Sequence, residues 1–404
     1  MFKTKHGAVF SLALTFLVSA LAPGWAASPV TIDVVIPLSG NAAFLGHGEQ
    51  VALQVLEKAT NADGGIAGRP LHFNFLDDQT SPQTAVQLMS KILASNPPVV
   101  LGSNPLATCN AMAALITDGP VEYCFSPIID FPAGSYIFSA STSEMALMAA
   151  LIRYDRMRGW KRIAVIVTTD ATGYAGLRDI KEVLKRSENK DVELVAAETF
   201  NGNAISVSAQ LQLIKDAHPD TLIAYSTGAP IALVLRGLQD AGIDVPVATS
   251  GGNMTFAQMS AYRTFLPKNL YFPTAEWVVS SSAEDRKIHL PEGVVKAKEF
   301  LAAAYQAAGE KLPDAVANYS WDPAKIVVDA LRKLGPDTTA EQLRNYIAHL
   351  QNYAGIDGVY DFQKSPQRGL SDDAVVMTRW SPEKNNWVIV SEPGGAPADV
   401  ATAK

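Results

Sequence analysis

The chain has 404 residues, of which 48% are hydrophobic and 18% are charged, and its formal net charge is −7 at pH 7. This length and composition allow two globular domains, each with a hydrophobic core of its own. An acidic surface repels phosphate backbones, so the composition argues against nucleic acid as a partner.

The first 26 residues have the features of a secretory signal peptide. Lys3 and Lys5 give a positive start, residues 8–22 form an apolar run, and Gly24 and Ala26 supply the small residues of a cleavage site. The apolar run has about 15 residues, whereas a membrane-spanning helix needs about 20. We therefore expect residues 1–26 to be removed on export.

The two cysteines, Cys109 and Cys124, are candidates for a disulfide in an oxidising compartment. Closing a loop of this size stabilises a fold by roughly 3 kcal/mol. Two buried free thiols are the alternative. Two cysteines and six scattered histidines form no recognisable metal-binding spacing, so we expect neither a metal nor a cofactor.

Predicted strands and helices alternate along the first part of the chain. Strands at 32–36, 71–76, 99–101 and 121–125 are separated by helices at 48–59, 82–94 and 111–117. This order is typical of a parallel sheet covered by helices.

The same order restarts after a short extended segment at 136–138. Helices are expected at 144–158, 175–186, 205–217 and 231–241, and strands at 163–167, 192–197, 222–225, 245–248 and 269–272. Two more helices, 294–308 and 323–334, precede a tail that favours antiparallel strands at 359–362, 374–380 and 387–390.

The pattern predicts an α/β fold of two Rossmann-like lobes with parallel sheets. We expect residues 28–140 and about 274–348 in the first lobe, and about 141–273 and 349–395 in the second, followed by a flexible tail at 396–404. Open α/β sheets bind ligands beyond the carboxyl ends of their strands, so two facing lobes predict a cleft that closes on a ligand.

Motifs of enzymes are weak or missing. Gly46-x-Gly48 superficially resembles a dinucleotide fingerprint, but it lies too far after its strand and ends in Val51. Neither a Gly-x-Ser-x-Gly elbow nor a His-Glu-x-x-His helix occurs in the sequence. These patterns favour binding over catalysis.

Several short motifs, in order, resemble one known family. They are P-L-S-G at 37–40, G-G-I-A-G-R-P-L at 64–71, D-D-Q-T-S-P at 77–82, V-V-L-G-S-N at 99–104, C-F-S-P at 124–127, Tyr319-x-x-Asp322, and I-D-G-V-Y-D-F at 356–362. From about Thr31 to Val390 the chain resembles type I periplasmic solute-binding proteins of the leucine/isoleucine/valine-binding kind.

The resemblance implies two lobes joined by about three crossings and one small solute bound between them. It further implies a monomer in the periplasm that delivers its solute to an inner-membrane ABC permease and its ATPase subunit. An alternative is a receptor subunit that presents its closed form to a sensor kinase or chemoreceptor. Such a subunit would close its two lobes on a solute in the same way.

Candidate ligand-binding residues follow from the same resemblance. In the first lobe they are Ser39, Asn41 and Phe44, then Asn104, Leu106, Ala107 and Thr108, then Ile129 and Asp130. In the second lobe they are Thr172 and Tyr174, Tyr225 and Thr227, and finally Gly252 and Asn253.

One departure from the family pattern bears on the solute. Amino-acid binders commonly carry an acidic residue in the loop that corresponds to residues 249–253, and here that loop reads T-S-G-G-N. A buried ammonium needs a carboxylate or several acceptors to offset its desolvation. We therefore expect a small organic acid or aromatic compound, with an amino acid or amide as the alternative if Asp130 supplies the missing charge.

Overall fold

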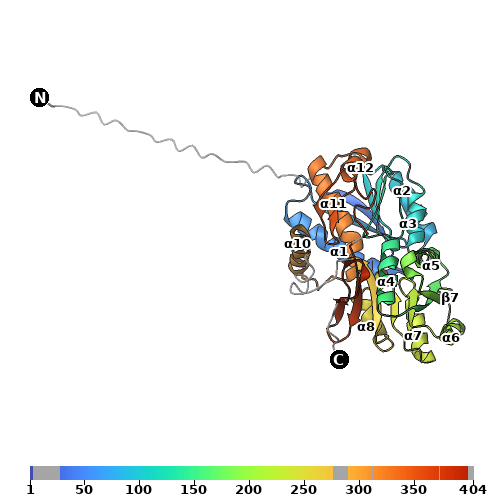
Figure 1. The fold of residues 1–404 in the computed structure, drawn as a ribbon. Helices are drawn as coiled ribbons and strands as arrows, with labels where there is room; N and C mark the ends of the chain where they lie inside the picture. The colour runs from blue at the N-terminus through green and yellow to red at the C-terminus, as the bar shows by residue number, and fades with distance from the viewer. Residues whose placement is uncertain (3–27, 276–289, 312, 373, 399–404) are drawn as a thin grey trace.

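The structure is a computed structural model that describes residues 1–2, 28–275, 290–311, 313–372 and 374–398. The expected signal peptide therefore lies almost entirely outside the described residues. Two lobes, each built on its own sheet, lie one above the other in Figure 1.

The first lobe contains a parallel sheet with the strand order β2-β1-β3-β4-β5. Its strands are β1 (Val30–Ile36), β2 (Leu71–Asp77), β3 (Val99–Gly102), β4 (Val121–Cys124) and β5 (Ile137–Ser139). Its helical segments are α1 (Ala43–Ala62), α2 (Pro82–Leu93), α3 (Leu106–Ala113), α10 (Glu292–Ala308), η3 (Ala315–Ala317), α11 (Asn318–Leu334) and α12 (Ala340–Ala348), and a hairpin of β11 (Tyr353–Ala354) and β12 (Val359–Tyr360) follows.

Successive residues of β1 face opposite helix layers, as the alternation of a strand requires. Val34 and Ile36 belong to the core shared with α1 and α11, whereas Val35 packs with Met89 of α2 and Met112 of α3. Both faces of the sheet are therefore buried, which explains the continuous apolar run in this strand.

The second lobe has the strand order β14-β13-β10-β9-β8-β6-β7. Its parallel strands are β6 (Arg162–Thr168), β7 (Glu193–Phe200), β8 (Thr221–Tyr225), β9 (Val247–Thr249) and β10 (Leu270–Ala275), and the antiparallel strands β13 (Val375–Ser381) and β14 (Asn386–Ile389) extend one edge. Its helical segments are α4 (Glu144–Met157), α5 (Ala171–Leu184), η1 (Ser187–Asn189), α6 (Ser208–Asp216), α7 (Ile231–Ala241), η2 (Gly251–Asn253), α8 (Phe256–Tyr262) and η4 (Pro393–Gly395).

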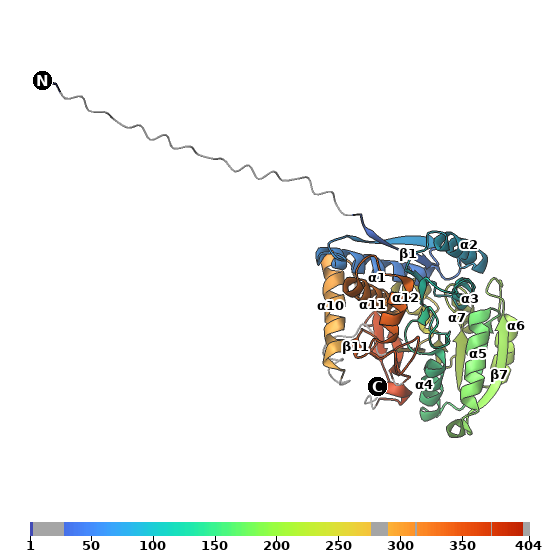
Figure 2. The same ribbon diagram turned by 90° about the horizontal axis from the view of Figure 1, so that it is seen from above.

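Helices cover both faces of the second sheet as well (Figure 2). Val165 and Val167 of β6 pack with the layer of α4 and α5, and Ala164 and Ile166 pack with the layer of α6, α7 and α8. The predicted α/β fold with two lobes and parallel sheets is thus confirmed.

The chain crosses between the lobes three times: between β5 and α4, between β10 and α10, and between β12 and β13. The expected boundary at residue 349 does not hold. Phe362 packs edge-on against Phe138 of the first lobe, with ring centroids 5.6 Å apart, and the Ser139 amide donates to the Gln367 carbonyl over 2.8 Å. Aromatic side chains of this segment fill the first core, so the chain returns to the second lobe only from β13 onward.

The tail also differs from expectation. β12 pairs with β11 and not with the C-terminal hairpin. Residues 396–398, expected to begin a flexible tail, are held by a hydrogen bond from the Ala398 amide to the Val390 carbonyl over 3.1 Å. Residues 399–404 lie outside the described residues.

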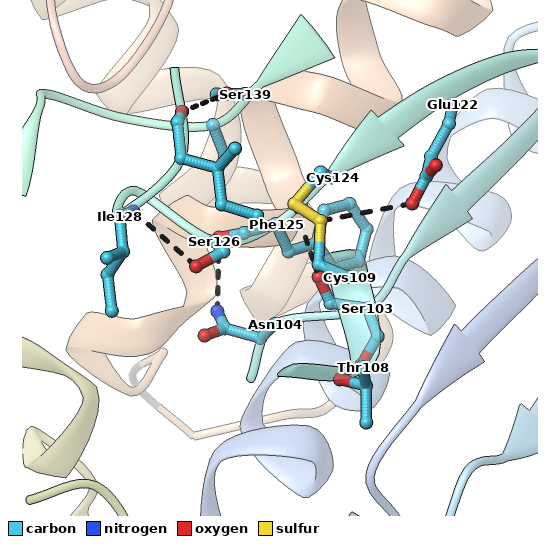
Figure 3. The surroundings of a disulfide bond; sticks show 12 residues. Ser103, Asn104, Thr108, Cys109, Glu122, Cys124, Phe125, Ser126, Ile128 and Ser139 are labelled. Carbon is cyan, nitrogen blue, oxygen red and sulfur yellow. Dashed lines mark hydrogen bonds between the residues drawn. A yellow bond between two sulfur atoms is a disulfide. The ribbon is translucent and has the colours of Figure 1, made fainter. Parts of the chain in front are cut away.

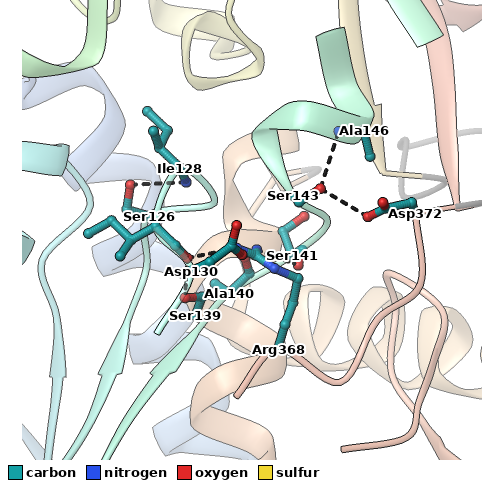
Figure 4. Close-up of polar contacts among 11 residues, drawn as sticks. Ser126, Ile128, Asp130, Ser139, Ala140, Ser141, Ser143, Ala146, Arg368 and Asp372 are labelled. Carbon is teal, nitrogen blue, oxygen red and sulfur yellow. Dashed lines mark hydrogen bonds and ion pairs between the residues drawn. The ribbon is translucent and has the colours of Figure 1, made fainter. Parts of the chain in front are cut away.

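Polar contacts join the first and third crossings (Figure 4). The buried Arg368 guanidinium donates to the carbonyls of Ala140 and Ser141, each over 3.2 Å. The Ser143 hydroxyl donates to Asp372 over 2.9 Å and accepts from the Ala146 amide at the start of α4. These bonds fix the direction in which α4 leaves the crossing.

Several helices begin earlier than their apolar periodicity predicts. α3 begins at Leu106 and not at Ala111, and α5 begins at Ala171 because the Asp170 side chain accepts from the Gly173 amide and caps the helix. α8 and α12 were not predicted. No helix within the described residues is long and apolar enough to cross a bilayer.

A disulfide joins Cys109 of α3 to Cys124 of β4 (Figure 3). Both cysteines are fully buried, in a cluster with Leu106 and Ile129. The bond ties the short helix α3 directly to the central part of the sheet.

Replacing both cysteines by alanine should lower the free energy of unfolding by roughly 3 kcal/mol, because the unfolded chain regains the entropy of an open loop. Urea unfolding of the mature protein, followed by circular dichroism, measures this loss. Cys109→Ala alone should cost nearly as much as the double variant. Two single losses that simply add would show that packing, and not the bond, stabilises this region.

Candidate functional site

A cavity of about 300 Å³ lies between the lobes. It is lined by the segments that follow β1, β2, β3 and β4 in the first lobe and β6, β8 and β9 in the second, with contributions from α4, β10 and α11. The carboxyl ends of both parallel sheets therefore meet at one cavity, as the strand order predicts.

About half of the predicted ligand-binding residues line this cavity. They are Asn41, Asn104, Ala107, Thr108, Thr172, Tyr225, Thr227 and Gly252. Because α3 and α5 begin early, Ala107, Thr108 and Thr172 lie in the first turns of these helices. The N-terminus of α3 has no side-chain cap, so its first amides remain available to an acceptor on a ligand.

The other predicted residues do not line the cavity. The exposed Ser39 donates to Asp77 over 2.7 Å, and Phe44 packs edge-on against Tyr262 with ring centroids 6.2 Å apart. Leu106 and Ile129 are buried beside the disulfide, and Tyr174 is 53% exposed. Leu106 and Ile129 are each one residue from a residue that lines the cavity, and Ser39, Phe44 and Tyr174 are each two residues from one.

Asp130 does not supply a charge to the cavity. Its carboxylate lies 2.7 Å from the guanidinium of Arg368, and its side chain is 79% exposed (Figure 4). The residue therefore belongs to the polar contacts at the crossings.

Asn253 is buried and structural. Its side-chain amide donates to the Ser226 carbonyl over 2.7 Å and to the Thr249 hydroxyl over 3.0 Å, and its oxygen accepts from the Gly228 amide over 2.8 Å. All of its hydrogen-bonding capacity is used inside the lobe. An acid at this position would face the loop and not the ligand.

The cavity wall also contains an acidic residue that was not among the predicted site residues. Glu144, the first residue of α4, lines the cavity with a side chain that hydrogen-bonds the Tyr225 hydroxyl. Burial raises the pKa of Glu144 to about 7, although the hydrogen bond from Tyr225 opposes the shift. The only sequence signal was its place directly after Ser143, which an ordinary helix start explains equally well.

Asn104 is held in one orientation by a buried residue behind the wall. Its side-chain nitrogen donates to Glu49 over 2.7 Å and to the Phe125 carbonyl over 3.2 Å. Because a backbone carbonyl can only accept, the nitrogen must face it, which leaves the Asn104 side-chain oxygen for the cavity (Figure 3 shows this side chain). Burial raises the pKa of Glu49 well above its usual value.

The lobes touch around the cavity. The Ala229 amide donates to the Asn41 carbonyl over 2.8 Å, and the Phe256 amide donates to Asp314. A Cβ atom added at Gly228 would lie 2.0 Å from the Asn41 carbonyl oxygen, so only glycine permits this approach. The two lobes are therefore in contact at the rim of the cavity.

The charged residues that line the cavity are all acidic. Among the described residues that line the cavity, Glu144 and Asp170 are the only acidic ones, and none is a lysine or an arginine. Within the same described residues, no group of three or more histidine, cysteine or acidic side chains could hold a metal ion.

Solved structures of similar fold come from several bacteria. One is a type 1 periplasmic binding protein from Bordetella pertussis, 19% identical, covering 91% of this chain and 100% of the other with a TM-score of 0.74. Another is the substrate-binding protein of a branched-chain amino acid transporter from Streptococcus pneumoniae in complex with isoleucine, 18% identical, covering 90% and 99% with a TM-score of 0.74. A third is an extracellular ligand-binding receptor from Verminephrobacter eiseniae, 16% identical, covering 89% and 100% with a TM-score of 0.76.

No curated protein sequence matches this chain. The periplasmic binding protein family matches residues 29–384, which is most of the chain. Members of this family bind small solutes and are not enzymes, in agreement with the missing catalytic motifs. The chain belongs to the periplasmic binding proteins, of the type I class that includes the leucine/isoleucine/valine-binding proteins.

Proposed function

We propose that this protein is the solute-binding subunit of an ABC importer, exported to the periplasm by a cleaved signal peptide. It captures one small organic solute between its lobes and presents the closed form to a permease and its ATPase subunit. The observation that carries this proposal is the cavity of about 300 Å³ enclosed between lobes that touch around it.

The size and lining of the cavity favour a small solute with both apolar and polar parts. Its volume lies at the lower end of the range of about 300–1,000 Å³ for ligand pockets. Ile128, Leu147 and Met148 provide apolar surface, and the uncapped N-terminus of α3 provides amides for an acceptor such as a carboxylate. Both classes of solute expected from the sequence, organic acids and amino acids, carry such a group.

Closure is the mechanism that this arrangement supports. A solute that contacts both lobes stabilises the closed form by the difference between its affinities for the closed and the open form. Arg368 and Asp372 hold the first and third crossings together, so their hydrogen bonds lie where the lobes would move relative to each other. Binding therefore shifts a population of conformations without any covalent chemistry.

A thermal-shift screen of the refolded, ligand-stripped mature protein tests the proposal. The panel should include branched and aromatic amino acids, amides, aromatic acids and small dicarboxylates. A true solute at about 100 times its Kd stabilises the protein by roughly 2.7 kcal/mol, which raises Tm by several degrees. A panel of this breadth that leaves Tm unchanged would contradict the proposal.

Gly228→Ala should weaken the affinity for a solute identified by that screen at least tenfold, because the added methyl group blocks contact with the Asn41 carbonyl. Gly242→Ala is the matched control. Both glycines have positive φ, but nothing lies within 4 Å of a Cβ atom at Gly242. Both variants should lose about 1–2 kcal/mol of stability.

Isothermal titration calorimetry gives the two affinities, and urea unfolding gives the two stabilities. If Gly228→Ala binds the solute as tightly as Gly242→Ala does, the close approach of the lobes is not required for binding.

A further inference from the structure

We propose that Glu144 selects a solute with a protonated amino group, so that the protein binds an amino-acid-like solute in preference to an organic acid of the same shape. This inference rests on the proposed solute-binding function. It replaces the expectation from the sequence that the absence of an acid in residues 249–253 removes the partner of an ammonium group.

The geometry of Glu144 leaves half of its carboxylate available. One oxygen, Oε1, accepts from the Tyr225 hydroxyl, and within the described chain the other, Oε2, has no hydrogen-bond partner. The residue lines the cavity although it is only 3% exposed. A carboxylate withdrawn from water to this extent is stabilised by a cation that hydrogen-bonds the free oxygen.

Among the residues that the structure describes, no side chain provides such a cation inside the cavity. No lysine or arginine is among the described lining residues, and Asp170 adds a second acidic group to the wall. A solute with a carboxylate alone would bring a further negative charge to this wall. A solute with an ammonium group as well would match Glu144, while its carboxylate could lie at the amides of α3.

The Asn104 side chain also favours solutes that donate hydrogen bonds. Because its nitrogen donates to Glu49 and to the Phe125 carbonyl, it presents only its oxygen to the cavity. This oxygen accepts hydrogen bonds from an ammonium or amide N–H and has nothing to offer a carboxylate. Glu49, buried behind the wall, acts as a positioning residue for Asn104.

Burial of an acid is not in itself evidence of a binding role, since Glu122 and Asp155 are also fully buried. Neither of them lines the cavity. Glu144 differs because its side chain lines the space in which a solute must lie, and only one of its two carboxylate oxygens is used by Tyr225. Glu122 therefore provides a matched control, being a buried glutamate outside the cavity.

The test compares matched pairs of compounds on the full mature protein. The probes are leucine with 4-methylpentanoate, phenylalanine with 3-phenylpropanoate, and glutamine with 4-carbamoylbutanoate, each titrated by calorimetry. Wild-type protein should bind the amino member of at least one pair tenfold or more tightly than its partner without the amino group.

Glu144→Gln should weaken binding of that amino member at least tenfold and change binding of its partner by less than threefold. Glutamine keeps the size of the side chain and can still accept from Tyr225, so the Tm of the free protein should change little. Glu122→Gln should leave both affinities unchanged.

The pH dependence gives an independent readout. An ammonium group lowers the pKa of Glu144 from about 7, so affinity should be highest above that pH and fall as the pH drops below it, toward tenfold per unit. The same dependence should be absent in Glu144→Gln. The titratable and charged groups that face Glu144 from neighbouring elements, and that the variant leaves in place, are Tyr225, Tyr319, Asp179, Arg178, Arg368 and Asp170.

The outcomes separate this inference from the proposed function. Tighter binding of the compounds without an amino group, or unchanged amine affinity in Glu144→Gln, would overturn the role of Glu144 and leave the solute-binding function intact. If no member of any pair binds, the role of Glu144 in selecting an amino-acid-like solute is overturned, and the broader thermal-shift panel decides separately whether the proposed function stands.

Discussion

Two parallel sheets turn the carboxyl ends of their strands toward the same gap, and the position of every cavity-lining loop depends on this arrangement. The loops are short and begin helices, so small and polar side chains such as Thr108 and Thr172 lie in first helical turns around the cavity. Three crossings of the chain connect the two sheets. Contacts at Gly228 and Asn41 bring the lobes together at the rim of the gap.

Burial sets the chemistry inside the gap. A carboxylate in bulk water discriminates little between solutes, because water solvates it as well as any ligand does. Glu144 is removed from water, and its pKa of about 7 reflects the balance between burial and the hydrogen bond from Tyr225. A ligand that hydrogen-bonds this buried carboxylate gains more binding free energy than it would from an exposed carboxylate. One residue at a helix start can thereby decide the class of solute.

The alternation of strands and helices was sufficient to predict two α/β lobes, and family motifs placed loops such as Tyr225-Ser-Thr227 at the cavity. Sequence periodicity could not assign residues 350–370 to the first lobe, since that follows from aromatic packing of Phe362 on Phe138. Glu144 was missed for a similar reason. An acid at the start of a helix is ordinarily explained by the helix dipole, and its proximity to Tyr225, 81 residues away, arises only from the first crossing.

The most direct test of this account is a crystal structure of the mature protein with its bound solute. We expect density between the lobes, with an amino nitrogen of the solute within hydrogen-bonding distance of Glu144 Oε2 and near the Asn104 side-chain oxygen. A solute bound with a carboxylate or apolar group against Glu144, or bound outside this cavity, would contradict it.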